Sequence, residues 1–491
     1  MSFNNNESPQ TSFFDLAGQQ TGQPITLARA IQLILLVAIF LGIYFSPMEH
    51  ISPTAAPTLA LVVAVVWIWI TGCMSLAVGC MVLFLGGIYL GLFSYGAFAQ
   101  SFGGSPFVPM IGMFIMSMGA SRTNVAKRIA YIFLSRLGKS PSSILLAIAI
   151  STTIVSFFVS NLGTAIVMAS IAIGILSELG EEKGKSGLGK AIMLAIPIFS
   201  MVGGMAFITS SASPNMMGIA MLERSTNGEF TVTFLQWASI GIPTAFIVIL
   251  PTWFIYCKAF GIKNTTEKDI DIDSFRQKLK DLGPFCGAEL RWFLIVVGFI
   301  FSLIFGWLNL PMAALTFGFI TVAPFVGVVK PDDAFKSLPF EVLMLIGFSP
   351  IIANIVNDSE LGVWAVRNLF GWAHGLHPFL IMLIATFTAC FMINVFANAT
   401  IGIIGVVIVA LTPFVVANGL NPTIALLPAM FMGSHTTVLG IQTNMVLTYH
   451  YGYWDMKDPI KPGLATALVW TVMLTVVAYF LGPLVGMPIL L

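Results

Sequence analysis

The chain has 491 residues, of which 57% are hydrophobic and only 9% are charged, and its formal net charge is +1. This composition is typical of a polytopic membrane protein with little water-exposed mass, and it lacks the basic excess of a nucleic-acid-binding protein. The five cysteines show no CxxC spacing and the five histidines form no HExxH pattern. We therefore predict no metal site, no disulfide framework and no enzyme of a recognisable catalytic class.

In chain order, residues 1–28 are rich in Asn, Gln and Ser and predict a disordered tail. Apolar runs that are long enough to cross a bilayer, or nearly so, follow at 30–46, 55–71, 73–93, 107–120, 190–222, 233–257, 291–307, 310–328, 341–357, 422–449 and 463–488. These runs predict an all-α membrane protein with eleven transmembrane helices. Two further apolar runs carry polar interruptions and predict a different element.

The first interrupted run, 142–179, contains a polar island of Ser160, Asn161, Gly163 and Thr164. A Ser-Asn pair followed by Gly favours the end of one helix, a turn and the start of another. In hydrocarbon, such a break survives only where it is packed in protein or lines a wet cavity. We therefore predict a re-entrant hairpin with a polar tip, whose free backbone N–H groups attract anions.

The second interrupted run repeats this design. Pro378 opens an apolar run that reaches Asn398 and ends near Val416. Asn398 follows Pro378 by 20 residues, just as Asn161 follows Pro141 by 20. An ordinary helical hairpin with a tight polar turn remains the alternative for each copy, and the shared spacing favours two re-entrant hairpins.

The distribution of Lys and Arg orients the spans. With a cytoplasmic N-terminus, 20 of the 22 basic residues fall inside, and only Arg224 and Arg367 fall outside. An odd number of spans then places the C-terminus outside. The first hairpin, flanked by Lys139 and the charged stretch 181–185, enters from the cytoplasm, whereas the second has no basic flank and enters from outside. The two copies are therefore predicted to be inverted.

An inverted repeat also predicts the domain organisation. Scaffold helices and an interfacial helix occupy 29–138, and the first hairpin with a broken helix occupies 139–257. A charged cytoplasmic linker, 258–289, is expected to be a solvated connector. Scaffold helices and an interfacial helix return at 290–376, and the second hairpin with its broken helix occupies 377–491.

Each hairpin is followed by a second polar interruption. In 208–218, Pro214 removes a backbone donor and disfavours helix at Ser213, and Asn215 follows directly. In 433–446, Asn444 plays the part of Asn215. Four polar breaks in inverted pairs are typical of a secondary transporter whose site lies between the repeats at mid-membrane.

The motifs SNLGT, TSSASPN, FANAT and GIQTN resemble the hairpin tips and unwound helices of the divalent anion:sodium symporters, within the ion transporter superfamily. The resemblance covers nearly the whole chain from about residue 30. It implies a homodimeric elevator transporter in the lipid bilayer of the cytoplasmic membrane, carrying dicarboxylates, tricarboxylates or sulfate. The substrate-binding residues that it implies are Ser160, Asn161, Thr164, Ser213, Pro214, Asn215, Asn398, Thr400, Thr443 and Asn444.

The chain departs from this family at the positions that help to hold sodium. Leu162 stands where the first tip has Thr, and Ala397 and Ala399 stand where the second has Ser and Thr. We therefore favour an exchanger of dicarboxylates with weak sodium dependence. The alternative is sodium-coupled symport, with Na⁺ held near Asn161 and Asn398 by backbone carbonyls. No organic cofactor is expected.

Three other interpretations stay open. His435 is the only ionisable side chain near a break, so it is a candidate proton site; the alternative is a neutral histidine bonded within the bundle. A cation/proton antiporter or an oxyanion transporter of the same superfamily is less well supported, because neither tip carries an acid. An intramembrane enzyme would depend on Ser434 and His435, and nothing in the sequence orients that pair.

Overall fold

The computed structural model describes residues 27–48, 52–103, 107–262, 272–348, 350–362, 364, 368, 371–397 and 399–491. Within these ranges the regular elements are helices, apart from an isolated antiparallel bridge between Leu420 and Leu490. Eight helical stretches are long and apolar enough to cross a membrane: Leu27–Tyr44, Asn161–Glu178, Gly187–Gly204, Phe234–Ala259, Phe340–Asp358, Pro378–Val395, Thr400–Ala417 and Ile460–Leu484. The chain is thus an all-helical, multi-pass membrane protein.

The first scaffold segment contains five helices, α2 (Leu27–Tyr44), α3 (Ala55–Thr71), α4 (Leu76–Tyr89), α5 (Tyr95–Gly103) and α6 (Phe107–Ser121). Helix α2 begins at Leu27 and so includes the last two residues of the predicted tail, 1–28, and residues 1–26 of that tail lie outside the described residues. No residue of the strongly apolar α2 is buried, as expected of a helix that faces lipid.

The corresponding segment of the second half contains α14 (Ala288–Ile304), α15 (Leu310–Val322), α16 (Pro331–Lys336), α17 (Phe340–Phe348), α18 (Pro350–Asp358) and the 3₁₀ turn η1 (Gly371–Ala373). The second interfacial helix is predicted at 357–372, and residues 363, 365–367, 369 and 370 of that stretch lie outside the described residues. Helices α6 and α15 cross where Gly112 meets Gly318, and a Cβ on Gly112 would lie 2.1 Å from the carbonyl oxygen of Ala314. This crossing therefore requires glycine, as do many close contacts between membrane helices.

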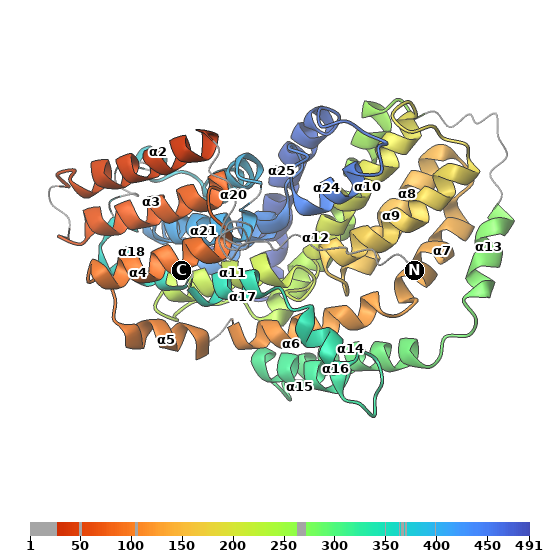
Figure 1. Ribbon diagram of the computed structural model, residues 1–491, viewed down its shortest axis with the longest axis horizontal. Coiled ribbons are helices and arrows are strands. Elements are labelled where there is room, and N and C mark those ends of the chain that lie inside the picture. The colour runs from red at the N-terminus through yellow and green to blue at the C-terminus, as the bar shows by residue number, and fades with distance from the viewer. Residues whose placement is uncertain are drawn as a thin grey trace, which may run out of the picture.

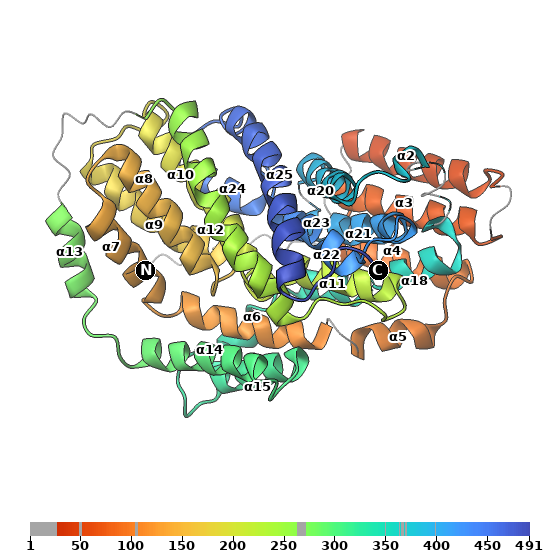
Figure 2. The same cartoon turned by 180° about the vertical axis from the view of Figure 1, so that it is seen from behind.

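Two helical hairpins lie in opposite halves of the molecule along its long axis, and α2 and α3 extend farther out than the second hairpin does (Figures 1 and 2). The first consists of α8 (Pro141–Ser156) and α9 (Asn161–Glu178), and the second of α20 (Pro378–Val395) and α21 (Thr400–Ala417). Each begins with proline in its first turn, where the missing N–H has no helical partner to lose. Asn398, between α20 and α21, lies outside the described residues.

The first broken helix consists of α10 (Gly187–Gly204) and α11 (Ala212–Ser225), and α12 (Phe234–Ala259) follows it. The interruption covers 205–211, so it begins three residues before the predicted start of the break and ends earlier too. Pro214 lies in the first turn of α11, because proline is tolerated there without loss of a helical hydrogen bond. Every residue of α10 from Ala191 to Gly204 is buried, so this helix runs through the core.

The second broken region is more fragmented. It contains α22 (Pro422–Ala425), α23 (Leu427–Phe431) and η2 (Met432–Ser434), then an irregular segment, 435–442, and α24 (Thr443–Tyr449). Helix α25 (Ile460–Leu484) is the last helix of the described chain. Beyond it, Leu491 donates its N–H to the carbonyl of Gly419 at 3.0 Å, and Asn421 donates to Ile489 at 2.8 Å. Residues 489–491 are thus paired with the segment that directly follows α21.

Helices α7 (Val125–Leu137) and α13 (Ile272–Asp281) lie beside the first hairpin, and α7 packs on both α8 and α13. The buried face of α7 is Ala126, Ala130 and Leu134, and the two alanines allow α7 to approach its neighbours closely. The linker 258–289 is not simply a solvated connector, because Phe275 of α13 is buried.

Candidate substrate cavity

A cavity of about 470 Å³ lies where the two hairpin tips and the two helix breaks meet. Its described lining comes from both halves of the chain: Phe114, Ser117, Met118, Ser121, Ser160, Asn161, Leu162, Ser211, Ser213, Pro214, Ser337, Pro339, Val342, Leu345, Ala397, Ala399, Thr400, Ile401, Gly402, Ser434, Gln442, Thr443 and Asn444. None of these residues carries a charge. The cavity is therefore a neutral, hydroxyl- and amide-rich chamber inside an apolar protein.

The predicted substrate residues divide into two groups. Those that line the cavity are Ser160, Asn161, Ser213, Pro214, Thr400, Thr443 and Asn444. Thr164 and Asn215 are buried behind the wall, where the Thr164 hydroxyl lies 3.5 Å from the carbonyl of Val159. Asn398 lies outside the described residues.

The first tip is organised by hydrogen bonds among its own residues. Ser160 is the N-cap of α9 and accepts a bond from the N–H of Gly163. Asn161 accepts a bond from the Ser156 hydroxyl at 3.1 Å and donates through Nδ2 to the Ser211 hydroxyl at 3.3 Å. The Asn161 amide therefore fastens the tip to the first break while it borders the cavity.

The Asn215 side chain hydrogen-bonds the backbone carbonyls of the first break. Its side-chain Nδ2 lies 3.0 Å from the carbonyl oxygen of Gly204, 3.2 Å from that of Phe207 and 3.3 Å from that of Ile208. These carbonyls cannot all find helical partners, since the chain is unwound there. Asn215 therefore stabilises the interruption from within α11.

The second break is held by a residue that the sequence did not single out. Asn394, near the end of α20, accepts bonds from the N–H groups of Thr437 and Val438 at 2.8 and 3.1 Å. Its Nδ2 donates to the carbonyls of Cys390 and His435. Asn444, by contrast, is buried and its Nδ2 has no hydrogen-bond partner in the described part of the chain. That amide is a free donor beside the cavity.

His435 does not line the cavity. Its Nε2 lies 2.8 Å from the carbonyl oxygen of Met201, and its ring packs edge-on against Trp470. The Ser434 hydroxyl lies 3.5 Å from Nδ1, at the limit of a hydrogen bond. This position favours the alternative of a histidine bonded within the bundle.

Helix N-termini give the cavity a positive electrostatic potential. Helices α9, α11 and α21 begin at Asn161, Ala212 and Thr400, so their first turns face the cavity from three directions. The N-cap residues Ser211 and Ala399 make no side-chain capping bond, which leaves the N–H groups of α11 and α21 unoccupied by a cap. Each helix start carries about half a positive charge, so the cavity favours an anion without any Lys or Arg.

Sequence reasoning missed several polar wall residues. Ser117 and Ser121 come from α6, Ser337 comes from the turn before α17, and Gln442 ends the second break. Ser117 and Ser121 are four residues apart on an apolar helix, so they share one face. Two hydroxyls at that spacing were a detectable signal of a polar wall.

Comparison with known proteins places this geometry in a family. The chain matches the family described as "Sodium:sulfate symporter transmembrane region" over residues 27–487. The chain belongs to this family of divalent anion:sodium symporters. It is therefore a membrane transporter rather than an enzyme, which confirms both of those predictions.

Among its relatives, the transporter is 24% identical over 408 residues to a Staphylococcus aureus (strain USA300) protein named sodium-dependent dicarboxylate transporter SdcS, covering 76% of each chain. The fold resembles that of Neisseria gonorrhoeae MtrF, described with a class of antimetabolite efflux pumps, with a TM-score of 0.57, 12% identity and 96% and 97% coverage. It also resembles the Alcanivorax borkumensis YdaH transporter, with a TM-score of 0.54, 13% identity and 82% and 90% coverage. At these identities the two structures support the fold alone.

Proposed function

We propose that this protein is a secondary transporter that carries small dicarboxylates across the cytoplasmic membrane. The observation that carries the proposal is a neutral cavity lined by residues of three helix starts and by Asn444, whose buried amide nitrogen has no partner among the described residues. A dianion inside such a cavity is stabilised by fixed dipoles that need no reorganisation on binding. Tricarboxylates and inorganic oxyanions such as sulfate are the alternative substrates.

Donors to a dicarboxylate come from both halves of the chain: Ser160 and Asn161 belong to the first tip, Thr400 to the second, and Thr443 and Asn444 to α24. Helix α11 packs against α21, and α24 packs against α9, so the two halves interlock around the cavity. A C4 acid bound there would engage residues of both halves. The name of the Staphylococcus aureus relative, a dicarboxylate transporter, supports this substrate class.

Transport by an elevator movement follows from the position of the site. Asn161 bonds the first tip to the first break, and Asn394 bonds the second hairpin to the second break. His435 of the second break lies 2.8 Å from the carbonyl oxygen of Met201 in α10, which joins the two halves into one unit. We propose that this unit carries the anion past the scaffold helices α6 and α17, which close the other wall of the cavity. A homodimer of the scaffold segments would anchor that movement in the bilayer.

Exchange is the proposed mode of coupling. Leu162, Ala397 and Ala399 offer no side-chain oxygen to a cation. Two side-chain oxygens near the tips already accept protein hydrogen bonds: Asn161 Oδ1 accepts from Ser156, and Asn394 Oδ1 accepts from two backbone N–H groups. Sodium-coupled symport is the second candidate, favoured by the name of the Staphylococcus aureus relative.

The test is uptake of labelled C4 and C6 acids into proteoliposomes, either empty or preloaded with the same acid, at zero and at high Na⁺. We expect preloading to accelerate uptake strongly and Na⁺ to change it little. Strong Na⁺-driven uptake into empty vesicles would replace exchange by symport. Failure to move any dicarboxylate under all four conditions would overturn the substrate class itself.

The proposed orientation has a separate test. A cysteine placed in 181–187 should react with an impermeant thiol reagent only from the cytoplasm, and one placed in 417–421 only from outside. Reaction of both from the same side would contradict the inverted topology with the N-terminus inside and the C-terminus outside. Crosslinking of the purified protein in membranes would test the homodimer.

A further inference from the structure

The first hairpin tip is bonded to the scaffold at a single serine of α6. The backbone N–H of Ser160 donates to the Ser117 hydroxyl oxygen at 2.9 Å. Ser117 also borders the substrate cavity. It is therefore a scaffold side chain that touches both the tip and the space proposed for the anion.

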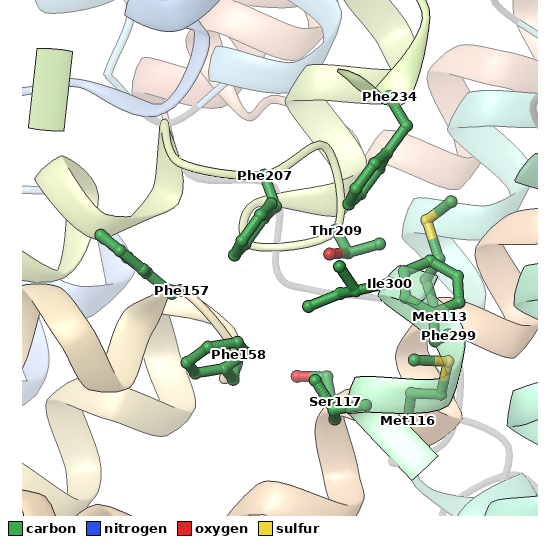
Figure 3. A pocket seen from close by; sticks show the side chains of 11 residues that line it. Met113, Met116, Ser117, Phe157, Phe158, Phe207, Thr209, Phe234, Phe299 and Ile300 are labelled. Atoms are coloured by element: carbon green, nitrogen blue, oxygen red, sulfur yellow. The ribbon is translucent and has the colours of Figure 1, made fainter. Parts of the chain in front are cut away.

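The contact zone around this bond is apolar. Figure 3 shows Phe157, Phe158 and Phe207 of the hairpin and break facing Met113 and Met116 of α6, with Ser117 at the edge of the group. Phe158 also packs edge-on against Trp292 of α14. Apolar and methionine contacts are not directional, so such surfaces can shift against one another at little cost. A hydrogen bond is directional and fixes one relative position.

The Ser117 hydroxyl has a proton that the bond to Ser160 does not use, since the serine oxygen is the acceptor there. Its neighbour Ser121 differs in this respect. The Ser121 hydroxyl lies 3.1 Å from the carbonyl of Met118 and 3.4 Å from that of Ser117, so its proton is directed to its own helix. Both serines line the cavity, but only Ser117 is positioned to donate to an anion.

We propose that Ser117 is a positioning residue that ties the first tip to the scaffold in one transport state and donates its hydroxyl proton to the bound anion in that state. The inference rests on the proposed function, because it requires the tip to move away from α6 during transport. After that movement the Ser117 contacts are lost, so the two states bind the anion with different affinity. Ser117 thus makes the apparent affinity depend on the face of the membrane.

The experiment compares Ser117→Ala with Ser302→Ala, which removes a buried scaffold hydroxyl from α14 that bonds the carbonyl of Phe299 in its own helix and does not line the cavity. Labelled succinate uptake is measured in right-side-out and inside-out membrane vesicles. For Ser117→Ala we expect the half-saturating concentration to rise about threefold to tenfold on one face and not to rise on the other. Ser302→Ala should change neither face by more than about twofold. An equal rise on both faces, or no rise on either, would overturn the proposal.

A second measurement needs no substrate. Leu162, at the tip, is 40% exposed and lines the cavity, so Leu162→Cys in a background without the five native cysteines reports access to the tip. Ser117→Ala should change its rate of reaction with an impermeant maleimide, and Ser117→Thr, which keeps the hydroxyl, should restore the rate. An unchanged rate would contradict the tie to the scaffold. If wild-type protein moved no dicarboxylate but this rate still responded to Ser117→Ala, the proposed function would fail while the tie itself stood.

Discussion

The two helix breaks of this transporter place an asparagine at matching positions and use it differently. Asn215 gives its side-chain nitrogen to three backbone carbonyls of its own break. Asn444 is equally buried, yet its nitrogen has no partner among the described residues. The asparagine nitrogen of the first break is therefore hydrogen-bonded within the break, whereas the asparagine nitrogen of the second is available to a ligand.

The difference arises because another residue stabilises the second break. Asn394 reaches from α20 and bonds Thr437, Val438 and the carbonyl of His435. The tips differ in the same direction, since Ser160 caps α9 but Ala399 makes no cap for α21. The second half therefore holds an uncapped helix start at α21 and an amide nitrogen without a partner among the described residues, whereas the first half holds the uncapped start of α11.

We expect the largest loss of transport when a negative charge replaces the amide of Asn444. Asn444→Asp would oppose a substrate carboxylate at about 4 Å, which costs roughly 4 kcal/mol at an effective dielectric constant of about 20. We expect uptake to fall by about a thousandfold in proteoliposomes, with the thermal unfolding midpoint nearly unchanged. Retained uptake would mean that Asn444 does not face the anion.

The two tips provide the next comparison. Asn161→Ala and Asn398→Ala should each remove a donor to a carboxylate, worth about 1.5–3 kcal/mol, and so reduce uptake by about tenfold to 150-fold. Asn161→Ala should also lower the unfolding temperature, because Asn161 bonds Ser156 and Ser211. Wild-type uptake in either purified variant would identify that tip as a structural turn.

Asn215→Ala should act on stability. Its removal leaves buried carbonyls of the first break without a donor, which we expect to lower the free energy of unfolding by about 2–3 kcal/mol. Thermal unfolding in detergent measures the change, and Asn444→Ala is the matched control because its nitrogen bonds no described residue. Equal destabilisation by both variants would remove the contrast between the breaks.

We expect the smallest change, in both stability and substrate affinity, when the start of α21 receives a capping side chain. Ala399→Ser offers a hydroxyl to the free N–H groups at the start of α21, which should stabilise the protein by about 1 kcal/mol. The same hydroxyl competes with the anion, so succinate affinity should fall by a few-fold. Tighter binding in this variant would show that Ser donates to the substrate instead.

The sequence predicted the hairpins well because their signals are local. Proline begins each hairpin, polar residues interrupt each apolar run, and both features lie where the structure has helix starts and tips. The first break was placed too late, because the hydroxyl-rich stretch extends into the first turn of α11. Local chemistry therefore located the elements to within about one helical turn.

Roles that depend on tertiary partners could not be predicted in the same way. Nothing local distinguishes Asn215 from Asn444, because the difference is which carbonyls come within reach after folding. Asn394 looked like an ordinary residue of an apolar helix, and its side-chain bonds reach its own helical turn or a segment more than forty residues away. Ser117 and Ser121 gave a signal, but only the folded chain shows that α6 faces the cavity.

The pairing of residues 489–491 with 419–421 has a practical consequence for spectroscopy. Because Leu491 and Ile489 bond Gly419 and Asn421, the segment after α25 is held to the end of the second hairpin. A fluorophore or spin label attached near Leu491 would therefore report the position of that hairpin instead of the free motion of a chain end. Paired with a label on α6, it would give an interprobe distance that tracks displacement of the hairpin in real time.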